Sequence, residues 1–219
     1  RGLPPKERVM GKVLEVPAGG ELSSEQLQEL AQAARNAKII VFPTDTVYGI
    51  GSNGLIRAAS RRIYEIKVRD SMKPLPILVH SAEEAWKWVE PTPAARALAA
   101  RFWPGPLTLV LKPTKAGRVL TLPEFGTLAV RVPAHPLLAK LIEASGVPWA
   151  STSANMSGSP AIADGASAAA AFAGAVDYVV SAGRAGGTES TVVDAASEPP
   201  RVLREGALSG ADILGALAR

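Results

Sequence analysis

Four side chains that can form hydrogen bonds follow a short apolar run near the start of the chain: Thr44, Asp45, Thr46 and Tyr48. The run itself, residues 39–42, is rich in β-branched side chains and predicts a buried strand. Pro43 ends that strand, because proline has no N–H group to donate to a neighbouring strand. In open α/β sheets, ligands bind in the loops beyond the carboxyl ends of strands. Residues 38–53 therefore predict a binding loop for a small polar ligand.

Three cations gather in a short segment at the end of an expected helix: Lys67, Arg69 and Lys73. Arginine can bind two phosphate oxygens at once, and lysine adds a compact positive charge. The segment therefore suits a triphosphate. A solvated helix end would carry the same residues, because the helix dipole favours cations there. Taken alone, the segment favours the solvated helix end.

A second polar group follows the expected strand 147–150 and consists of Ser151, Thr152, Ser153 and Asn155. Such side chains can bind the polar parts of a ligand, but they also satisfy backbone groups in ordinary turns. Arg131 interrupts the apolar strand 128–132, and a buried guanidinium needs a carboxylate, a ligand or water beside it. Ser190 and Arg204 repeat this pattern of polar residues at the ends of strands.

Several common kinds of site are excluded by the residues present. The chain has no cysteine and only His80 and His135 as histidines, which excludes thiolate metal sites and a His-rich zinc site. Residues 49–54 match G-x-G-x-x-G, but no direct turn from strand into helix accompanies them, so we attribute the match to chance. The chain contains neither a Walker A loop nor a G-x-S-x-G motif.

The charge and composition favour a globular protein with an anionic ligand. A formal net charge of +4 suits nucleotides, phosphate or RNA, although a basic surface without such a ligand is equally consistent with it. No apolar run approaches the ~20 residues of a membrane-spanning helix. The lack of cysteine suits a reducing compartment, and we predict a cytoplasmic location. Because the chain starts at Arg1, an organellar location with a removed targeting segment stays open.

Expected strands and helices alternate along the chain, which predicts an α/β domain with a mixed sheet. The expected helices are 23–36, 58–66, 81–88, 94–102, 135–145, 166–173 and 209–218, the first and third opening with capping-box patterns. The expected strands are 12–16, 39–42, 75–79, 107–111, 128–132, 147–150, 176–180, 191–193 and 201–203. We interpret residues 1–20 as an N-terminal arm and residues 21–219 as the catalytic domain.

Taken in order, these motifs resemble the YrdC-like threonylcarbamoyl-AMP synthase family, in its single-domain form. The matching segments are residues 43–49, Lys67-x-Arg69, 73–75, 103–108, 131–133, 153–155, 190–192 and 203–206. Val68 departs from the glycine that often stands between the two cations in that family.

The resemblance implies a twisted sheet flanked by helices, with a large concave basic cavity. It implies that L-threonine, bicarbonate and ATP, with magnesium, give threonylcarbamoyl-adenylate and pyrophosphate. A downstream transferase complex would then modify an adenosine in tRNA, which the chain itself could bind weakly; no membrane is implied. The family pattern provides no protein side chain as a metal ligand.

The resemblance also implies roles for individual residues. The threonine-binding residues would be Thr46, His80, Arg131, Ser151 and Ser190. The nucleotide-binding residues would be Lys67, Arg69, Lys73, Thr127, Ser153, Asn155 and Arg204, with Lys67 and Arg69 also catalytic.

Two other interpretations remain open at this point. One is a carbamoyl-transfer domain of the kind found in hydrogenase-maturation proteins, although those lie in longer chains with zinc-finger cysteines. The other is a non-catalytic module that binds structured RNA, although only 5% of residues are aromatic, which is few for a protein that stacks on bases.

Overall fold

The computed structural model describes residues 10–68, 74–156 and 158–218. Its helices are α1 (Ser24–Arg35), α2 (Arg57–Lys67), α3 (Ala82–Trp88), α4 (Pro93–Phe102), α5 (Pro136–Ser145), α6 (Gly165–Phe172) and α7 (Gly210–Leu217), with two short 3-10 turns, η1 (Gly117–Leu120) and η2 (Pro123–Phe125). Its strands are β1 (Lys12–Glu15), β2 (Ile40–Phe42), β3 (Gly49–Asn53), β4 (Ile77–Leu78), β5 (Val89–Glu90), β6 (Leu107–Pro113), β7 (Leu128–Arg131), β8 (Trp149–Ser153), β9 (Tyr178–Ser181), β10 (Thr191–Asp194) and β11 (Arg201–Arg204).

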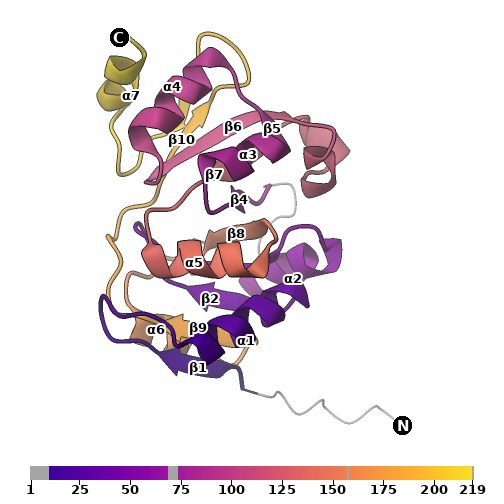
Figure 1. Ribbon diagram of the computed structural model, residues 1–219. Coiled ribbons are helices and arrows are strands. Elements are labelled where there is room, and N and C mark those ends of the chain that lie inside the picture. Colours follow the sequence, from indigo (N-terminus) through magenta and orange to yellow (C-terminus); the bar gives the residue numbers. More distant parts are fainter. Residues whose placement is uncertain (1–9, 69–73, 157, 219) are drawn as a thin grey trace.

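The strands form one twisted mixed sheet in the order β1-β9-β2-β3-β8-β4-β7-β6-β10-β11, with β5 added beside β6 (Figure 1). The pairs β1/β9, β2/β9, β4/β7 and β6/β10 are parallel, and the other neighbours along this path are antiparallel. The predicted α/β class, with helices flanking a twisted mixed sheet, is confirmed. The large concave basic cavity stays a prediction.

Two hydrophobic cores lie on the two faces of this sheet. One contains buried residues of α1 and α5, which pack together in front of β2 and β8 in Figure 1. The other contains buried residues of α2, α3, α4, α6 and α7. In β2, Ile40 and Phe42 belong to the first core, whereas Val41 and the preceding Ile39 belong to the second. Because residues 39–42 are buried on both faces, they read as a continuous apolar run.

The helix ends follow from the local sequence. Ser23 and Gln26 form the predicted capping box of α1, each side chain binding the other residue's backbone N–H. At α3 only half of the predicted box forms: the Ser81 hydroxyl accepts from the Glu84 N–H at 3.1 Å. The Glu84 carboxylate instead accepts from Lys87 and from the Trp88 indole.

The sequence prediction was wrong about the glycine-containing segment after the binding loop. Residues 49–53 form the buried strand β3 between β2 and β8, rather than part of the loop. A Cβ atom on Gly49 would lie 2.6 Å from the Phe42 ring, and one on Gly51 would lie 3.0 Å from it. Glycine is therefore needed for ring packing. This agrees with the rejection of residues 49–54 as a dinucleotide motif.

Two further predictions change in detail. Ser151 and Ser153 lie within β8 itself, which runs to Ser153, rather than in a loop after the strand. β5 and the two 3-10 turns were not predicted. Within residues 1–20, β1 pairs with β9 at the edge of the sheet, while the division into an arm and a catalytic domain stays a prediction.

Among the described helices, none has the length and apolar character to cross a membrane.

Val68, which ends α2, has an unusual backbone conformation for a β-branched residue. Its φ of 49° and ψ of 45° lie in the left-handed region, which glycine adopts far more easily. The side chain is 76% exposed, so little packing is lost when it is removed. We expect Val68→Gly to raise the free energy of unfolding by about 1 kcal/mol, as measured by urea denaturation. Val68→Ala serves as the control, because it keeps the Cβ atom and so the unfavourable left-handed conformation. If Val68→Gly is less stable than the wild type, the inference that the backbone is strained at Val68 is wrong.

Candidate active site

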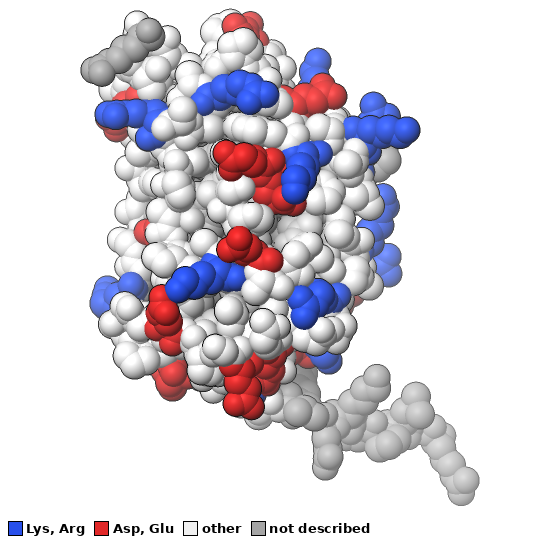
Figure 2. Space-filling view, viewed as in Figure 1, with Lys and Arg blue, Asp and Glu red and all other residues white. Residues whose placement is uncertain are grey.

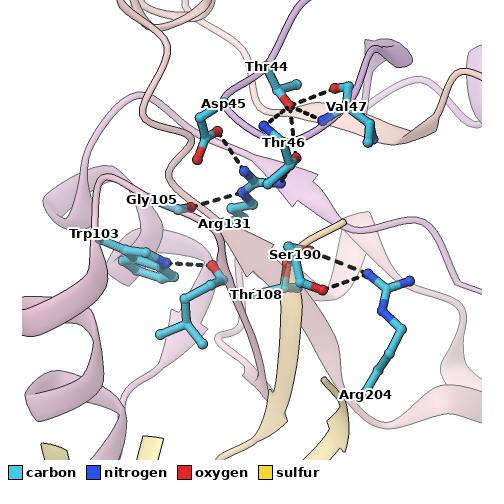
Figure 3. Close-up of polar contacts among 11 residues, drawn as sticks. Thr44, Asp45, Thr46, Val47, Trp103, Gly105, Thr108, Arg131, Ser190 and Arg204 are labelled. Atoms are coloured by element: carbon cyan, nitrogen blue, oxygen red, sulfur yellow. Dashed lines mark hydrogen bonds and ion pairs between the residues drawn. The ribbon is translucent and has the colours of Figure 1, made fainter. Parts of the chain in front are cut away.

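Arg131, at the end of β7, is the centre of a buried polar network (Figure 3). Its Nε donates to the Gly105 carbonyl at 3.0 Å, its NH1 group to the Thr46 Oγ1 at 3.0 Å, and its NH2 group to the Asp45 Oδ1 at 2.6 Å. The expectation that this guanidinium meets a carboxylate, a ligand or water is confirmed, because Asp45 is that carboxylate. These contacts use three of the five N–H donors of an arginine, so donors remain for a ligand.

The charge of Arg131 is held by a balance of opposing effects. Burial lowers the pKa of the Arg131 guanidinium, because it disfavours the charged form. The Asp45 carboxylate opposes this effect, and the nearby positive charge of Arg204 adds to it. A carboxylate ligand would therefore gain from both cations.

The loop that carries Thr46 is fixed by the hydroxyl group of Thr44. The Thr44 Oγ1 donates to the Val47 carbonyl at 2.6 Å and accepts from the Thr46 and Val47 N–H groups. The Thr44 and Thr46 hydroxyl oxygens lie 2.9 Å apart. The Thr46 Oγ1 in turn accepts from the Arg131 NH1 group. The N–H of Gly187 also holds the Thr46 carbonyl, at 2.6 Å.

Ser190, just before β10, and Arg204, at the end of the neighbouring strand β11, form a second contact (Figure 3). The Arg204 NH2 group donates to the Ser190 carbonyl at 2.8 Å, and its NH1 group lies 3.1 Å from a carboxylate oxygen of Glu189. The Ser190 and Thr108 hydroxyls are 3.0 Å apart. The Arg204 side chain is half-exposed, and its positive charge acts on the buried Arg131 guanidinium.

Lys67 reaches a third group of predicted residues from the end of α2. Its side chain is buried, and its Nζ donates to the Ser153 carbonyl and, at 3.1 Å, to the Asn155 Oδ1. The Ser153 hydroxyl donates to the same Asn155 oxygen at 2.6 Å. The N–H of the next residue, Ala154, donates to the Tyr48 carbonyl at 2.7 Å, which connects this group to the loop of Thr46.

Three further predicted residues within the described ranges, Ser151, Thr127 and His80, form no side-chain hydrogen bond to these groups. Ser151 is buried in β8, and the Thr127 hydroxyl donates to the Phe125 carbonyl in its own turn. His80 is half-buried and makes no side-chain hydrogen bond to a described residue, although the preceding N–H of Val79 donates to the Arg131 carbonyl at 3.1 Å. Arg69 and Lys73 lie outside the described residues.

Sequence reasoning missed several residues of the network. Gly105 contacts Arg131, and Thr108 contacts Ser190; both lie in a segment that sequence analysis noted only as a family motif. No local pattern in the sequence linked Glu189 to Arg204. His135 precedes α5 and has a buried Nδ1 atom without a hydrogen-bond partner among the described residues. No group of three or more His, Cys, Asp or Glu within the described ranges could hold a metal ion.

The burial of His135 predicts a stability that depends on pH. Burial lowers its pKa from the usual 6.5, and the charge of Asp45 only partly opposes this. The unfolded chain therefore takes up a proton as the pH falls through about 6.5, before the folded protein does. This contribution to stability is present above that pH and is lost below it.

We expect urea denaturation to show a larger loss of stability between about pH 7.5 and pH 5.5 in the wild type than in His135→Gln. The comparison removes the effect of other titrating groups, which both proteins share. An equal loss in the two proteins would contradict the lowered pKa.

Comparison with known proteins gives a consistent result. A family model named Sua5_yciO_yrdC, described as telomere recombination, matches residues 32–206. The chain is 44% identical to the threonylcarbamoyl-AMP synthase of Pyrococcus abyssi, over 80% of this chain and 52% of that protein. It is 39% identical to the Bacillus subtilis threonylcarbamoyl-AMP synthase, over 86% of this chain and 56% of that protein. It thus spans about half the length of these curated relatives.

A solved structure is also similar. The crystal structure of P. abyssi Sua5 complexed with L-threonine matches with a TM-score of 0.86 and 38% identity, over 94% of this chain and 60% of that chain. The family model covers most of the sequence. The family motifs identified in the sequence include the residues of the Arg131, Ser190 and Lys67 contacts. The chain belongs to the Sua5/YciO/YrdC family.

Proposed function

We propose that this chain is a threonylcarbamoyl-AMP synthase, a nucleotidyltransferase that uses L-threonine, bicarbonate and ATP with magnesium. The observation that carries the proposal is the Arg131 network, in which a buried guanidinium binds Gly105, Thr46 and Asp45, keeps further donors for a ligand and feels the positive charge of Arg204. Two relatives named threonylcarbamoyl-AMP synthase and a related structure holding L-threonine support it.

In this proposal Arg131 binds the carboxylate of L-threonine. Its donors that are not used by Asp45, Thr46 and Gly105 can form paired hydrogen bonds with the two oxygens of a carboxylate. Thr46, His80, Ser151 and Ser190 would surround the rest of the amino acid.

The nucleotide would be bound by residues from separate parts of the chain: Lys67, Arg69, Lys73, Thr127, Ser153, Asn155 and Arg204. Lys67 supports this role, because its buried ammonium group already meets Ser153 and Asn155. Magnesium would enter with ATP, held mainly by phosphate oxygens, as is usual for this ion.

The reaction would proceed in two steps. The amine of L-threonine and bicarbonate would form a carbamate with loss of water. A carbamate oxygen would then attack the α-phosphorus of ATP, forming the adenylate and releasing pyrophosphate. Such transfer depends on positioning and charge neutralisation rather than on a protein nucleophile. Lys67 and Arg69 would stabilise the charge that develops on the phosphate.

The product is a reactive mixed anhydride, so a transferase acting on tRNA must consume it soon after release. We propose such a downstream complex as partner, with weak binding of tRNA by this chain and a cytoplasmic location.

The test is to follow pyrophosphate release with ATP, magnesium and bicarbonate, with and without L-threonine. Release that depends on threonine, together with the adenylate detected by mass spectrometry, supports the synthase. Release without threonine contradicts it. No release, together with tight binding of structured RNA, would favour a non-catalytic RNA-binding module instead.

A further inference from the structure

A cavity of about 760 Å³ lies beside α2, away from the Arg131 network. One wall is formed by side chains of α2 and by Val68, which follows it, and the other by the segment from Val119 to Leu128. Leu75, just before β4, and Ala150 of β8 complete the lining. Its volume is within the range of ~300–1,000 Å³ that is common for small-molecule sites.

The cavity lies on the opposite face of the sheet from the proposed threonine site. Successive side chains of a strand point to opposite faces. In β8, Ala150 lines the cavity, so Ser151 points to the other face. In β7, Leu128 lines the cavity, and Arg131, an odd number of residues further on, points away from it. Among the residues that the structure describes, the lining includes none of those predicted to bind threonine or the nucleotide; Arg69 and Lys73 lie outside the described residues.

The walls of the cavity are mainly apolar. Leu120, Leu122, Phe125 and Leu75 supply aliphatic and aromatic surface, and the ring of Tyr64 lies among them. Two other lining residues are unusually exposed for their type, Val68 at 76% and Val119 at 45%. Exposed apolar side chains that border an apolar cavity are typical of a binding site.

Cations line the α2 side of this cavity. Arg57 and Arg61 lie one helical turn apart on α2, and both are exposed. Neither forms an ion pair with any residue that the structure describes, and Glu65 is the only acidic lining residue in that part of the chain. Figure 2 shows Lys and Arg side chains along the right-hand edge of the molecule, where α2 and the turns after β6 lie in Figure 1. An apolar ligand with a negative group therefore complements this site better than a neutral or cationic one.

We propose that this cavity binds an amphipathic organic anion. Its apolar body would pack between α2 and the segment from Val119 to Leu128, and its carboxylate or sulfonate group would bind Arg57 and Arg61.

The test uses anilinonaphthalene sulfonate as an amphipathic anion and phenylnaphthylamine as its neutral counterpart. Fluorescence titration of the folded protein should give saturable binding of both probes. We expect the double variant Arg57→Gln/Arg61→Gln to bind the sulfonate about five- to tenfold more weakly and the neutral probe unchanged. Ser60→Trp, which places a large ring in the cavity from α2, should weaken both probes at least tenfold.

Arg62→Gln is the matched control, because Arg62 lies on the same helix but pairs with Asp177 outside the cavity. It should leave the affinity for both probes unchanged. Saturating ATP, magnesium and L-threonine should not displace the sulfonate probe.

Two results would overturn the proposal. The first is equal affinity of the sulfonate for the wild type and the double arginine variant, with circular dichroism showing that both are folded. The second is competitive displacement by the substrates, which would make the cavity part of the catalytic site. If Ser60→Trp does not fold, the arginine variants and the displacement experiment still decide.

Discussion

Replacing Lys67 with methionine is expected to lower threonine-dependent pyrophosphate release by about 10²–10³-fold. The Lys67 ammonium is buried against the Ser153 carbonyl and Asn155, where it can meet the phosphates of ATP without first being ordered. Methionine keeps most of the aliphatic chain and removes the charge. The loss should therefore appear mainly in kcat, with the fold retained by circular dichroism. Lys67→Ala should give the same loss of rate.

Lys38→Met is the matched control for this prediction. Lys38 is exposed, and its Nζ lies 3.7 Å from the Asp177 Oδ1. Exposed ion pairs of this kind contribute little to stability. The turnover of the Lys38→Met enzyme should equal that of the wild type. A Lys67→Met enzyme with near-normal turnover would show that the ammonium does not act on the phosphates. The same role for Arg69 stays a prediction from the family resemblance.

Replacing Arg131 with methionine is expected to lower the free energy of unfolding by about 3–5 kcal/mol. The side chains of Arg131 and Asp45 are only 8% and 14% exposed, so the substitution leaves a nearly buried carboxylate without its partner. The variant should also lose binding of L-threonine in calorimetry, because the carboxylate of the ligand loses its guanidinium. Urea denaturation measures the first effect.

The double variant Arg131→Met/Asp45→Asn separates the two effects. It removes the unpaired charge, so much of the lost stability should return. Binding of L-threonine should not return, since the guanidinium is still missing. If the double variant binds L-threonine as the wild type does, Arg131 does not hold the ligand. If Arg131→Met lowers the free energy of unfolding by less than about 1 kcal/mol, the Arg131–Asp45 ion pair contributes no more than an exposed ion pair.

Local sequence patterns predicted the elements that depend on local interactions. The Ser23–Gln26 capping box and the helical spacing after it gave α1, and the apolar run at 39–42 gave β2. β3 could not be found in this way, because its glycines have low strand propensity. Their role is to leave room for the Phe42 ring, which packs edge-on against Trp149, and this packing exists only once β2, β3 and β8 lie side by side.

The candidate site divides in a similar way. A charged residue inside the apolar strand 128–132 predicted that Arg131 needs a partner. The identity of that partner, Asp45, depends on the order of the strands, because the two residues are 86 positions apart in the chain. The family motifs carried information about which distant residues meet. His135 gave no signal, since a histidine before a helix-opening proline is an ordinary residue at a helix start, and its burial arises from tertiary packing.

The position of β9 beside β2 affects how the protein can form on the ribosome. β2 is synthesised early, but its parallel neighbour β9 is Tyr178–Ser181, so one edge of β2 stays unpaired until most of the chain has emerged. Pairing of strands so distant in sequence is slow, and an open apolar edge invites association with other chains in the meantime. Nascent chains of this protein should therefore depend on protection by chaperones until β9 has been translated.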